Sequence, residues 1–440
     1  MTEKFNKAFK ELKKYECRSM HGQLPILWQS AEGCIVTDHE GDKYLDFTSS
    51  IFVANIGHSN PDVLAAIKDV IDSKLLHTYT YLNKYRIQYL KKLIEFAGAP
   101  FEKAFLASSG TEATESAMKL MRMHGFKINK KRKPGIISFN GSWHGRTMGS
   151  FMMSGGNSTN WWIGYEDPNI HHFNFPFPWK VSESEGEKAF FDEIKNLEKA
   201  GIIISKDICG FMIETFQGWG VLFYPKSYIK ALVNFAKENN ILVCFDEMQS
   251  GFYRTGKKFG YKHYDIEPDM ICIGKGMGSG LPISGILGKT ETLNLPLPGE
   301  MSSTNSANPL VCAAGLATIE YIENNNLEGH IQKVEKTFIN ELERIKETAP
   351  VKINFFSKGL VAAILFYEED GVTPDIEFTN KVVDECLKNK LIVVKTGRES
   401  IKLGPPLIIS ESQIKKGMRI IEKSIFKINA SSEFKSTTTK

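Results

Sequence analysis

The sequence contains few cysteines, and they are not arranged as metal-binding or redox pairs. Its seven thiols belong to Cys17, Cys34, Cys209, Cys244, Cys272, Cys312 and Cys386. The number is odd and no Cys-x-x-Cys pair is present, which argues against both a disulfide framework and a structural zinc site. We therefore expect reduced thiols and no metal site.

Long apolar runs and a strong charge are also missing. No run reaches the roughly 18 residues that a transmembrane helix needs. The first 14 residues lack the apolar stretch of a secretory signal. The formal net charge is +4 over 440 residues, which is too weak to indicate a nucleic-acid partner. These absences predict a cytoplasmic protein that binds neither nucleic acid nor membrane.

What the sequence does contain is a regular alternation of helix-period segments and short apolar runs. The expected helices are 62–76, 85–96, 111–124 and 226–238, and the expected strands are 104–107, 135–139, 209–213, 241–245 and 270–273. Short buried strands that alternate with helices are typical of an α/β protein with a mostly parallel central sheet.

The length of 440 residues favours one large domain and a smaller one. Residues 61–311 carry the alternating pattern and are predicted to form the large, cofactor-binding domain. Residues 1–60 and 312–428 mix helices with short strands and are expected to form a smaller α+β domain built from both termini. Residues 429–440 contain few apolar residues and are expected to be a disordered tail.

Two charged residues follow neighbouring strands of the expected sheet. Asp246 ends one apolar run and Lys275 follows the next, and ligands of open α/β sheets bind at the carboxyl ends of strands. A P-loop is excluded, because Ile283 occupies the position where its first glycine is required. A Lys amine can form a Schiff base with a carbonyl cofactor, and an Asp can keep a pyridine nitrogen protonated. Together they suit pyridoxal phosphate, although a structural ion pair would look the same.

The segment SSGTEATESAMKL follows the strand expected at 104–107. Ser109 and Glu112 have the spacing of a capping box, so a helix should begin there. A glycine-bearing turn at a helix N-terminus offers free N–H groups to a phosphate. An ordinary helix cap would have the same pattern.

Nine ordered motifs, taken together, resemble one family. They are GDKYLDF, GHSNP, SSGTEATESAMKL, SWHGRT, MIETFQG, FDEMQSGFYRTGKKFG, GKGMGSGLPISG, SSTNSANPL and GPPL. From about Ile26 to Ile409 the chain is similar to class III aminotransferases, the group that contains ornithine and 4-aminobutyrate aminotransferases. The resemblance implies the fold-type I architecture, pyridoxal 5′-phosphate as cofactor and transaminase activity.

The resemblance also implies which residues bind the cofactor. They are Gly110, Thr111, Trp143, Glu214, Asp246, Gln249, Lys275 and Thr304. Lys275 resembles the Schiff-base lysine, which also moves the proton on the substrate carbon. Asp246 resembles the carboxylate under the pyridine nitrogen, and Gln249 the residue beside the phenolic oxygen. Glu214 matches a glutamate near the cofactor.

Four further positions complete the implied cofactor site. Gly110 and Thr111 match the turn that holds the phosphate, and Trp143 matches a ring stacked on the pyridine face. Thr304 resembles the residue that reaches the phosphate of the neighbouring subunit's cofactor. The resemblance thus implies a homodimer with shared active sites.

The expected substrate-binding residues are Arg146, Trp219, Lys402 and Phe52. Arg146 matches a family arginine that can bind a carboxylate through two parallel hydrogen bonds, although an exposed salt bridge is an alternative role. Several relatives have a glutamate and an arginine where this chain has Trp219 and Lys402. A lysine does not replace a bidentate arginine, so the sequence departs from ornithine and 4-aminobutyrate enzymes at both positions.

The expected function is transfer of an amino group between a primary, terminal amine or an amino acid and a carbonyl acceptor such as a 2-oxo acid. Lys275 and Asp246 would be the catalytic residues. Two alternatives remain open from the sequence. One is an aminomutase or racemase of the same family, and the other is a catalytically inactive binding protein on the same fold.

Overall fold

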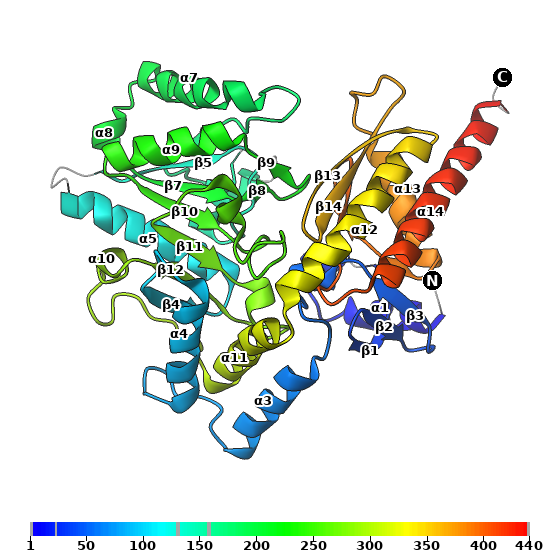
Figure 1. The fold of residues 1–440 in the computed structure, drawn as a ribbon, viewed down its shortest axis with the longest axis horizontal. Helices are drawn as coiled ribbons and strands as arrows, with labels where there is room; N and C mark the ends of the chain where they lie inside the picture. Colours follow the sequence, from blue (N-terminus) through cyan, green and yellow to red (C-terminus); the bar gives the residue numbers. More distant parts are fainter. Residues whose placement is uncertain (1–2, 23, 129–132, 156–159, 438–440) are drawn as a thin grey trace.

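The computed structural model describes residues 3–22, 24–128, 133–155 and 160–437. Figure 1 shows a large part built around a central sheet and a smaller part that contains both chain ends. No helix among these described residues is both long and apolar enough to cross a membrane.

The large part contains a seven-stranded sheet with the order β4-β12-β11-β10-β7-β5-β6. In chain order its strands are β4 (Lys103–Ala107), β5 (Gly135–Phe139), β6 (Ile170–Phe173), β7 (Ile208–Glu214), β10 (Leu242–Asp246), β11 (Met270–Ile273) and β12 (Ser284–Gly288). All neighbours are parallel except β12, which is antiparallel to both β11 and β4. The prediction of a mostly parallel sheet is confirmed.

Helices cover both faces of this sheet. In chain order the helices of this part are α3 (Pro61–Asp72), α4 (Lys84–Ala97), α5 (Gly110–Ile128), α6 (Met148–Met153), α7 (Gly186–Lys199), α8 (Ile204–Asp207), α9 (Lys226–Glu238), α10 (Thr290–Leu293) and α11 (Pro309–Asn324). Side chains of α5 pack with Met212 and Cys244, whereas those of α9 pack with the alternate residues Phe211 and Val243. Burial on both faces explains why these strands are continuous apolar runs in the sequence.

The smaller part joins segments from both ends of the chain. One sheet has the order β1-β2-β3-β15, in which the hairpin of β1 (Trp28–Glu32), β2 (Ile35–Asp38) and β3 (Lys43–Asp46) pairs with β15 (Leu391–Ile392). A second sheet has the order β13-β14-β17-β16. Its strands are β13 (Lys352–Lys358), β14 (Val361–Tyr367), β16 (Val394–Lys395) and β17 (Ser400–Leu403).

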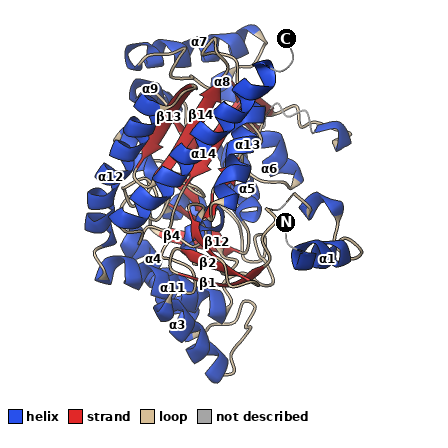
Figure 2. Cartoon of the chain, turned by 90° about the vertical axis from the view of Figure 1, so that its right-hand side faces the viewer, coloured by secondary structure: helices blue, strands red, loops and turns tan. Residues whose placement is uncertain are grey.

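Long helices cover the second sheet. They are α12 (Leu327–Thr348), α13 (Ile376–Lys388) and α14 (Glu411–Thr437), and Figure 2 shows α12 and α14 lying across β13 and β14. At the other end of the chain, α1 (Glu3–Leu12) precedes the hairpin, and α2 (Ser49–Phe52) follows β3. A short hairpin of β8 (Phe216–Gln217) and β9 (Leu222–Phe223) projects beyond β7.

The end of the chain differs from the sequence expectation. Residues 429–437, predicted to be part of a disordered tail, continue helix α14. This stretch contains no glycine or proline, so nothing in its sequence stops the helix. The last three positions of the predicted tail, 438–440, lie outside the described residues.

Candidate active site

Three ionisable side chains meet at the carboxyl ends of adjacent strands. Glu214 ends β7, Asp246 ends β10, and the strand register places these two residues opposite each other. On the other side Asp246 is paired with Cys272 of β11, and Lys275 follows that strand directly. The sequence therefore predicted correctly that Asp246 and Lys275 lie at the same edge of the sheet.

The Asp246 carboxylate is held by two neighbours. Its Oδ1 accepts a hydrogen bond from the Met248 N–H at 3.0 Å, and its Oδ2 lies 2.9 Å from Nδ1 of His144. His144 is buried, and its other ring nitrogen lies 3.2 Å from the Ser138 hydroxyl. His144 was not predicted from the sequence, although this residue follows Trp143 in the SWHGRT motif. Its role in the structure is to orient the carboxylate.

Lys275 lies in an environment that favours a neutral amine. Burial lowers the pKa of Lys275 below its ordinary value, while the nearby Asp246 and Glu214 oppose that change. Among the described residues, the Lys275 ammonium has no hydrogen-bond acceptor recorded. Its backbone has a φ of +46°, in the left-handed region that non-glycine residues rarely adopt. A partly buried lysine whose pKa is lowered can act as a nucleophile or a base.

Glu214 is fully buried beside these groups. Burial raises the pKa of Glu214 from 4.5 to about 7, and Asp246 adds to the rise while His144 and Lys402 oppose it. Its Oε1 accepts a hydrogen bond from Gln249 Nε2 at 3.3 Å. Its Oε2 is buried and has no hydrogen-bond partner among the described residues.

Lys402 reaches the same place from β17 of the smaller part. Its ammonium donates to Gln249 Oε1 at 2.8 Å and to the Gly218 carbonyl at 3.0 Å. Burial lowers the pKa of Lys402 to about 8, with Glu214 opposing and Lys275 adding to the effect. The Phe52 ring is fully buried, and its centroid lies 5.1 Å from the Lys402 ammonium. Both residues were predicted on the substrate side, and the structure brings them together.

The turn before α5 contains half of the predicted capping box, the hydrogen bond from the Ser109 N–H to the Glu112 side chain. Glu112 Oε2 accepts hydrogen bonds from the Ser108 and Ser109 N–H groups, each at 2.8 Å. The helix starts at Gly110, and the N–H groups of its first turn have no acceptor within the helix. Thr111 Oγ1 lies 2.5 Å from Thr147 Oγ1. Free N–H groups and the positive end of the helix dipole are suited to a phosphate.

Trp143 and Arg146 form the more exposed side. The Trp143 side chain is 46% exposed, and the Arg146 guanidinium lies 4.6 Å from its ring centroid. A large aromatic ring with this much free surface is not a core residue. Arg146 makes no ion pair with the described residues within 4.0 Å, so its alternative role as a salt bridge is not seen.

Trp219 has its own partners, separate from Lys402. Its Nε1 donates to Gln217 Oε1 at 2.9 Å, and the Arg398 guanidinium lies 3.8 Å from its ring centroid. The direction of Arg398 could not be inferred from the sequence. The structure shows that Arg398 covers Trp219 and also contacts Glu399.

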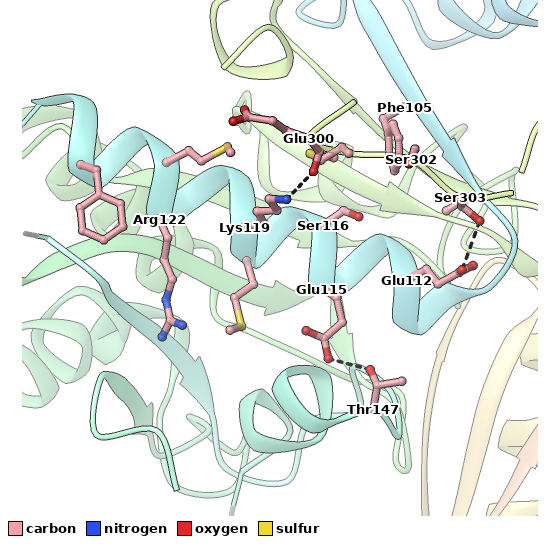
Figure 3. Close-up of a pocket in the computed structure, with 15 residues that line it drawn as sticks. Phe105, Glu112, Glu115, Ser116, Lys119, Arg122, Thr147, Glu300, Ser302 and Ser303 are labelled. Carbon is pink, nitrogen blue, oxygen red and sulfur yellow. Dashed lines mark hydrogen bonds between the residues drawn. The ribbon is translucent and has the colours of Figure 1, made fainter. Parts of the chain in front are cut away.

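Thr304 lies on an exposed segment, where its carbonyl accepts a hydrogen bond from His77 Nε2 at 2.9 Å. The preceding residues, Glu300–Ser303, line a cavity of about 750 Å³ against α5. Figure 3 shows Ser303 pointing to Glu112 and Lys119 pointing to Glu300 across this cavity. Lys275 and Asp246 are not among its lining residues.

Comparison with known proteins agrees with this geometry. The family model described as "Aminotransferase class-III" matches residues 17–425. The acetylornithine aminotransferase of Clostridium acetobutylicum is 29% identical over 407 residues, which cover 92% of this chain and 97% of that protein. The 4-aminobutyrate aminotransferase of Mycobacterium leprae is 29% identical over 416 residues, which cover 91% of each.

Solved structures show the same architecture. The acetylornithine aminotransferase of Elizabethkingia anophelis superposes with a TM-score of 0.79 at 27% identity and covers 97% of this chain and 100% of that one. A transaminase from the marine bacterium Virgibacillus has a TM-score of 0.87 at 23% identity, covering 97% and 99%, and supports the fold alone. The chain therefore belongs to the class III aminotransferase family, has the fold-type I architecture and is a transaminase.

Proposed function

We propose that this transaminase works with pyridoxal 5′-phosphate held by Lys275 and Asp246. The observation that carries the proposal is the meeting of the partly buried Lys275 amine, which makes no hydrogen bond with the described residues, with two carboxyl groups at the ends of β11, β10 and β7. Lys275 would bind the aldehyde carbon of the cofactor, and Asp246 would hold its pyridine nitrogen in the protonated form.

The remaining residues fit the same group. The free N–H groups at Gly110 and Thr111 suit its phosphate, and the half-exposed Trp143 suits its ring. Glu214 Oε2 is a buried oxygen without a partner among the described residues, and Gln249 is held beside it. Buried polar atoms normally have a hydrogen-bond partner, so an oxygen without one at this place supports a bound ligand.

When bound, pyridoxal 5′-phosphate supplies an electron sink for the carbon that bears the amine. Desolvation lowers the pKa of Lys275, which favours the neutral amine that can remove a proton from that carbon and later return it. His144 keeps the Asp246 carboxylate oriented. Glu214 remains partly protonated near neutral pH because its pKa is about 7.

We infer a substrate that carries a carboxylate. The Lys402 ammonium is buried, and its two hydrogen bonds go to neutral acceptors. A buried cation without a carboxylate partner retains attraction for an anion. Arg146 is exposed beside Trp143 and offers a second carboxylate-binding group. A primary amine donor and a 2-oxo acid acceptor fit these charges.

We infer further that two copies of the chain share their active sites. Thr304 is exposed, and the family resemblance directs it to the cofactor phosphate of a neighbouring subunit. Tyr81 and Leu82 are neighbours and are 77% and 82% exposed, so they offer an apolar contact to a second chain. All seven cysteines are free thiols, which supports a reducing compartment such as the cytoplasm.

Borohydride reduction of the loaded enzyme tests the cofactor assignment. Mass spectrometry of the digested protein should find the reduced cofactor on Lys275, and a label elsewhere, or none, would refute the proposal.

Adding one amine without an acceptor should convert the absorbance spectrum of the cofactor once, and sustained product formation would indicate an isomerase. Light scattering should give the mass of two chains.

A further inference from the structure

The segment that carries Phe52 has an unusual backbone. Ser49, Ser50, Ile51 and Phe52 have φ values of +49°, +51°, +60° and +68°. The left-handed conformation is unfavourable for L-residues other than glycine and is normally adopted by single residues. Four consecutive residues in this conformation persist only where the surrounding structure holds them. Strained backbone conformations of this kind are found most often at functional sites.

One side chain, Arg254, contacts both ends of this turn and the smaller part of the molecule. It is fully buried, and its Nη2 donates to Ser49 Oγ at 3.2 Å and to Asn55 Oδ1 at 2.7 Å. Its Nη1 donates to the carbonyls of Leu360 at 2.9 Å and Pro405 at 2.6 Å. The guanidinium therefore connects the loop after β10 with three distant segments of the chain.

All four acceptors of Arg254 are uncharged. Burial lowers the pKa of Arg254 to about 9, and only the carboxylate of Asp46 opposes the effect. A buried cation in such surroundings contributes little to stability compared with an apolar side chain of similar size. Its retention is better explained by the geometry that its planar fork imposes on its acceptors.

The position of Arg254 also affects Phe52, at the substrate-binding end of the site. The Phe52 ring has two cations nearby, with the Arg254 guanidinium 5.2 Å and the Lys402 ammonium 5.1 Å from its centroid. Both distances are within the range of cation–π attraction. A Cβ atom on Gly404 would come within 1.9 Å of the ring, so this position has to be a glycine for the ring to lie there.

The position of Arg254 also affects the turn that carries Lys275. Asn55, which accepts from Arg254, packs against Gly276, where an added Cβ would lie 2.2 Å from Asn55 Nδ2. Gly276 directly follows Lys275 in the turn Lys275–Met277. Arg254 is thus linked to Lys402 through Phe52 and to the Lys275 turn through Asn55.

We propose that Arg254 is a positioning residue that fixes the substrate-binding ammonium of Lys402 relative to Lys275 by holding the left-handed turn Ser49–Phe52. The inference rests on the roles proposed above for Lys275 and Lys402. Arg254 itself acts through its neighbours, so its loss should weaken substrate binding more than it slows the reaction of bound substrate.

The kinetic test compares Arg254→Lys, which keeps a basic side chain and loses the planar fork, with Arg344→Lys. Arg344 is a control in the smaller part, where it pairs with Glu341 and Glu422. Arg254→Lys should raise KM for a 2-oxo acid about tenfold and change kcat less than about threefold, since coupling between contacting residues is typically of this size. Equal KM values for the two variants would overturn the proposal.

A double-mutant cycle tests the path through Phe52. Phe52→Leu alone should raise KM, but in the Arg254→Lys background it should add less than about twofold, because both changes break one linkage. If the increases in KM caused by the two single substitutions multiply in the double variant, the linkage through Phe52 is overturned. If Arg254→Lys does not fold, Asn55→Ala, which removes one of the four acceptors, should raise KM in the same direction, and an unchanged KM would overturn the proposal.

A measurement without catalysis separates this inference from the proposed function. With 4-fluorophenylalanine at position 52 of the cofactor-free protein, the ¹⁹F spectrum should show one narrow signal. Arg254→Lys should broaden or split it, and Arg344→Lys should not. An unchanged signal in Arg254→Lys overturns the positioning role. A changed signal in a protein that has no transaminase activity would keep that role and refute the proposed function instead.

Discussion

The buried carboxyl of Glu214 should make the stability of the cofactor-free protein depend on pH in a defined way. Glu214→Gln removes the titrating group and keeps the shape of the side chain. The amide oxygen can still accept from Gln249 Nε2, while the new NH₂ group replaces an oxygen that has no partner among the described residues. An unsatisfied buried donor costs about 1–3 kcal/mol, but this cost is the same at every pH.

The size of the pH effect follows from the pKa of Glu214, which burial raises from 4.5 to about 7. A tenfold change in proton affinity is worth about 1.4 kcal/mol, so the rise corresponds to roughly 3 kcal/mol of folding free energy. Between these two pH values the folded protein binds more protons than the unfolded chain. The contribution of Glu214 to stability is therefore fully present below pH 4.5 and is lost as the pH rises through about 7.

Urea unfolding of both proteins, followed by circular dichroism at several values between about pH 4.5 and 8, measures the difference. The free energy of unfolding of Glu214→Gln, minus that of the wild type, should increase by about 3 kcal/mol over this interval. Glu32→Gln, on the exposed face of β1, serves as a control that should give a constant difference. A constant difference for Glu214→Gln as well would refute the argument from burial.

The other predictions concern turnover. Lys275→Ala should lower kcat by about a thousandfold or more while the fold is kept, because it removes the base, and undiminished turnover would exclude this role. Asp246→Asn should lower kcat by about a hundredfold or more and shift the visible absorbance of the loaded enzyme, since a neutral amide cannot stabilise a protonated ring nitrogen; an unchanged spectrum would contradict the assignment. Lys402→Arg combined with Trp219→Glu should improve kcat/KM for glutamate or 2-oxoglutarate, and unchanged kinetics would show that these positions do not set specificity.

The main sheet was largely predictable from the sequence, because parallel strands that are buried on both faces are continuous apolar runs. Strands β7, β10 and β11 were expected in nearly the observed positions, so the meeting of Asp246 with Lys275 was predictable too. Strands β6 and β12 were missed for a local reason. Their sequences, IHHF and SGILG, contain two histidines and two glycines, which are weak strand formers.

The contacts of the site that were not predicted join distant segments of the chain. His144 reaches Asp246 across 102 positions of the chain, and Lys402 reaches Gln249 across 153. Neither spacing leaves a periodic signal in the sequence. The linkage through Arg254 is harder still to predict, because its acceptors include two backbone carbonyls that any residue could supply.

The joint departure at Trp219 and Lys402 can now be interpreted from their separate partners. The family resemblance implies a switchable pair of a glutamate and an arginine at these two positions. In this chain Trp219 is engaged by Gln217 and Arg398, whereas Lys402 is engaged by Gln249 and the Gly218 carbonyl. No carboxylate has to leave before Lys402 can attract an anion. Lys402 thus makes its hydrogen bonds to neutral acceptors, and Trp219 takes no part in them.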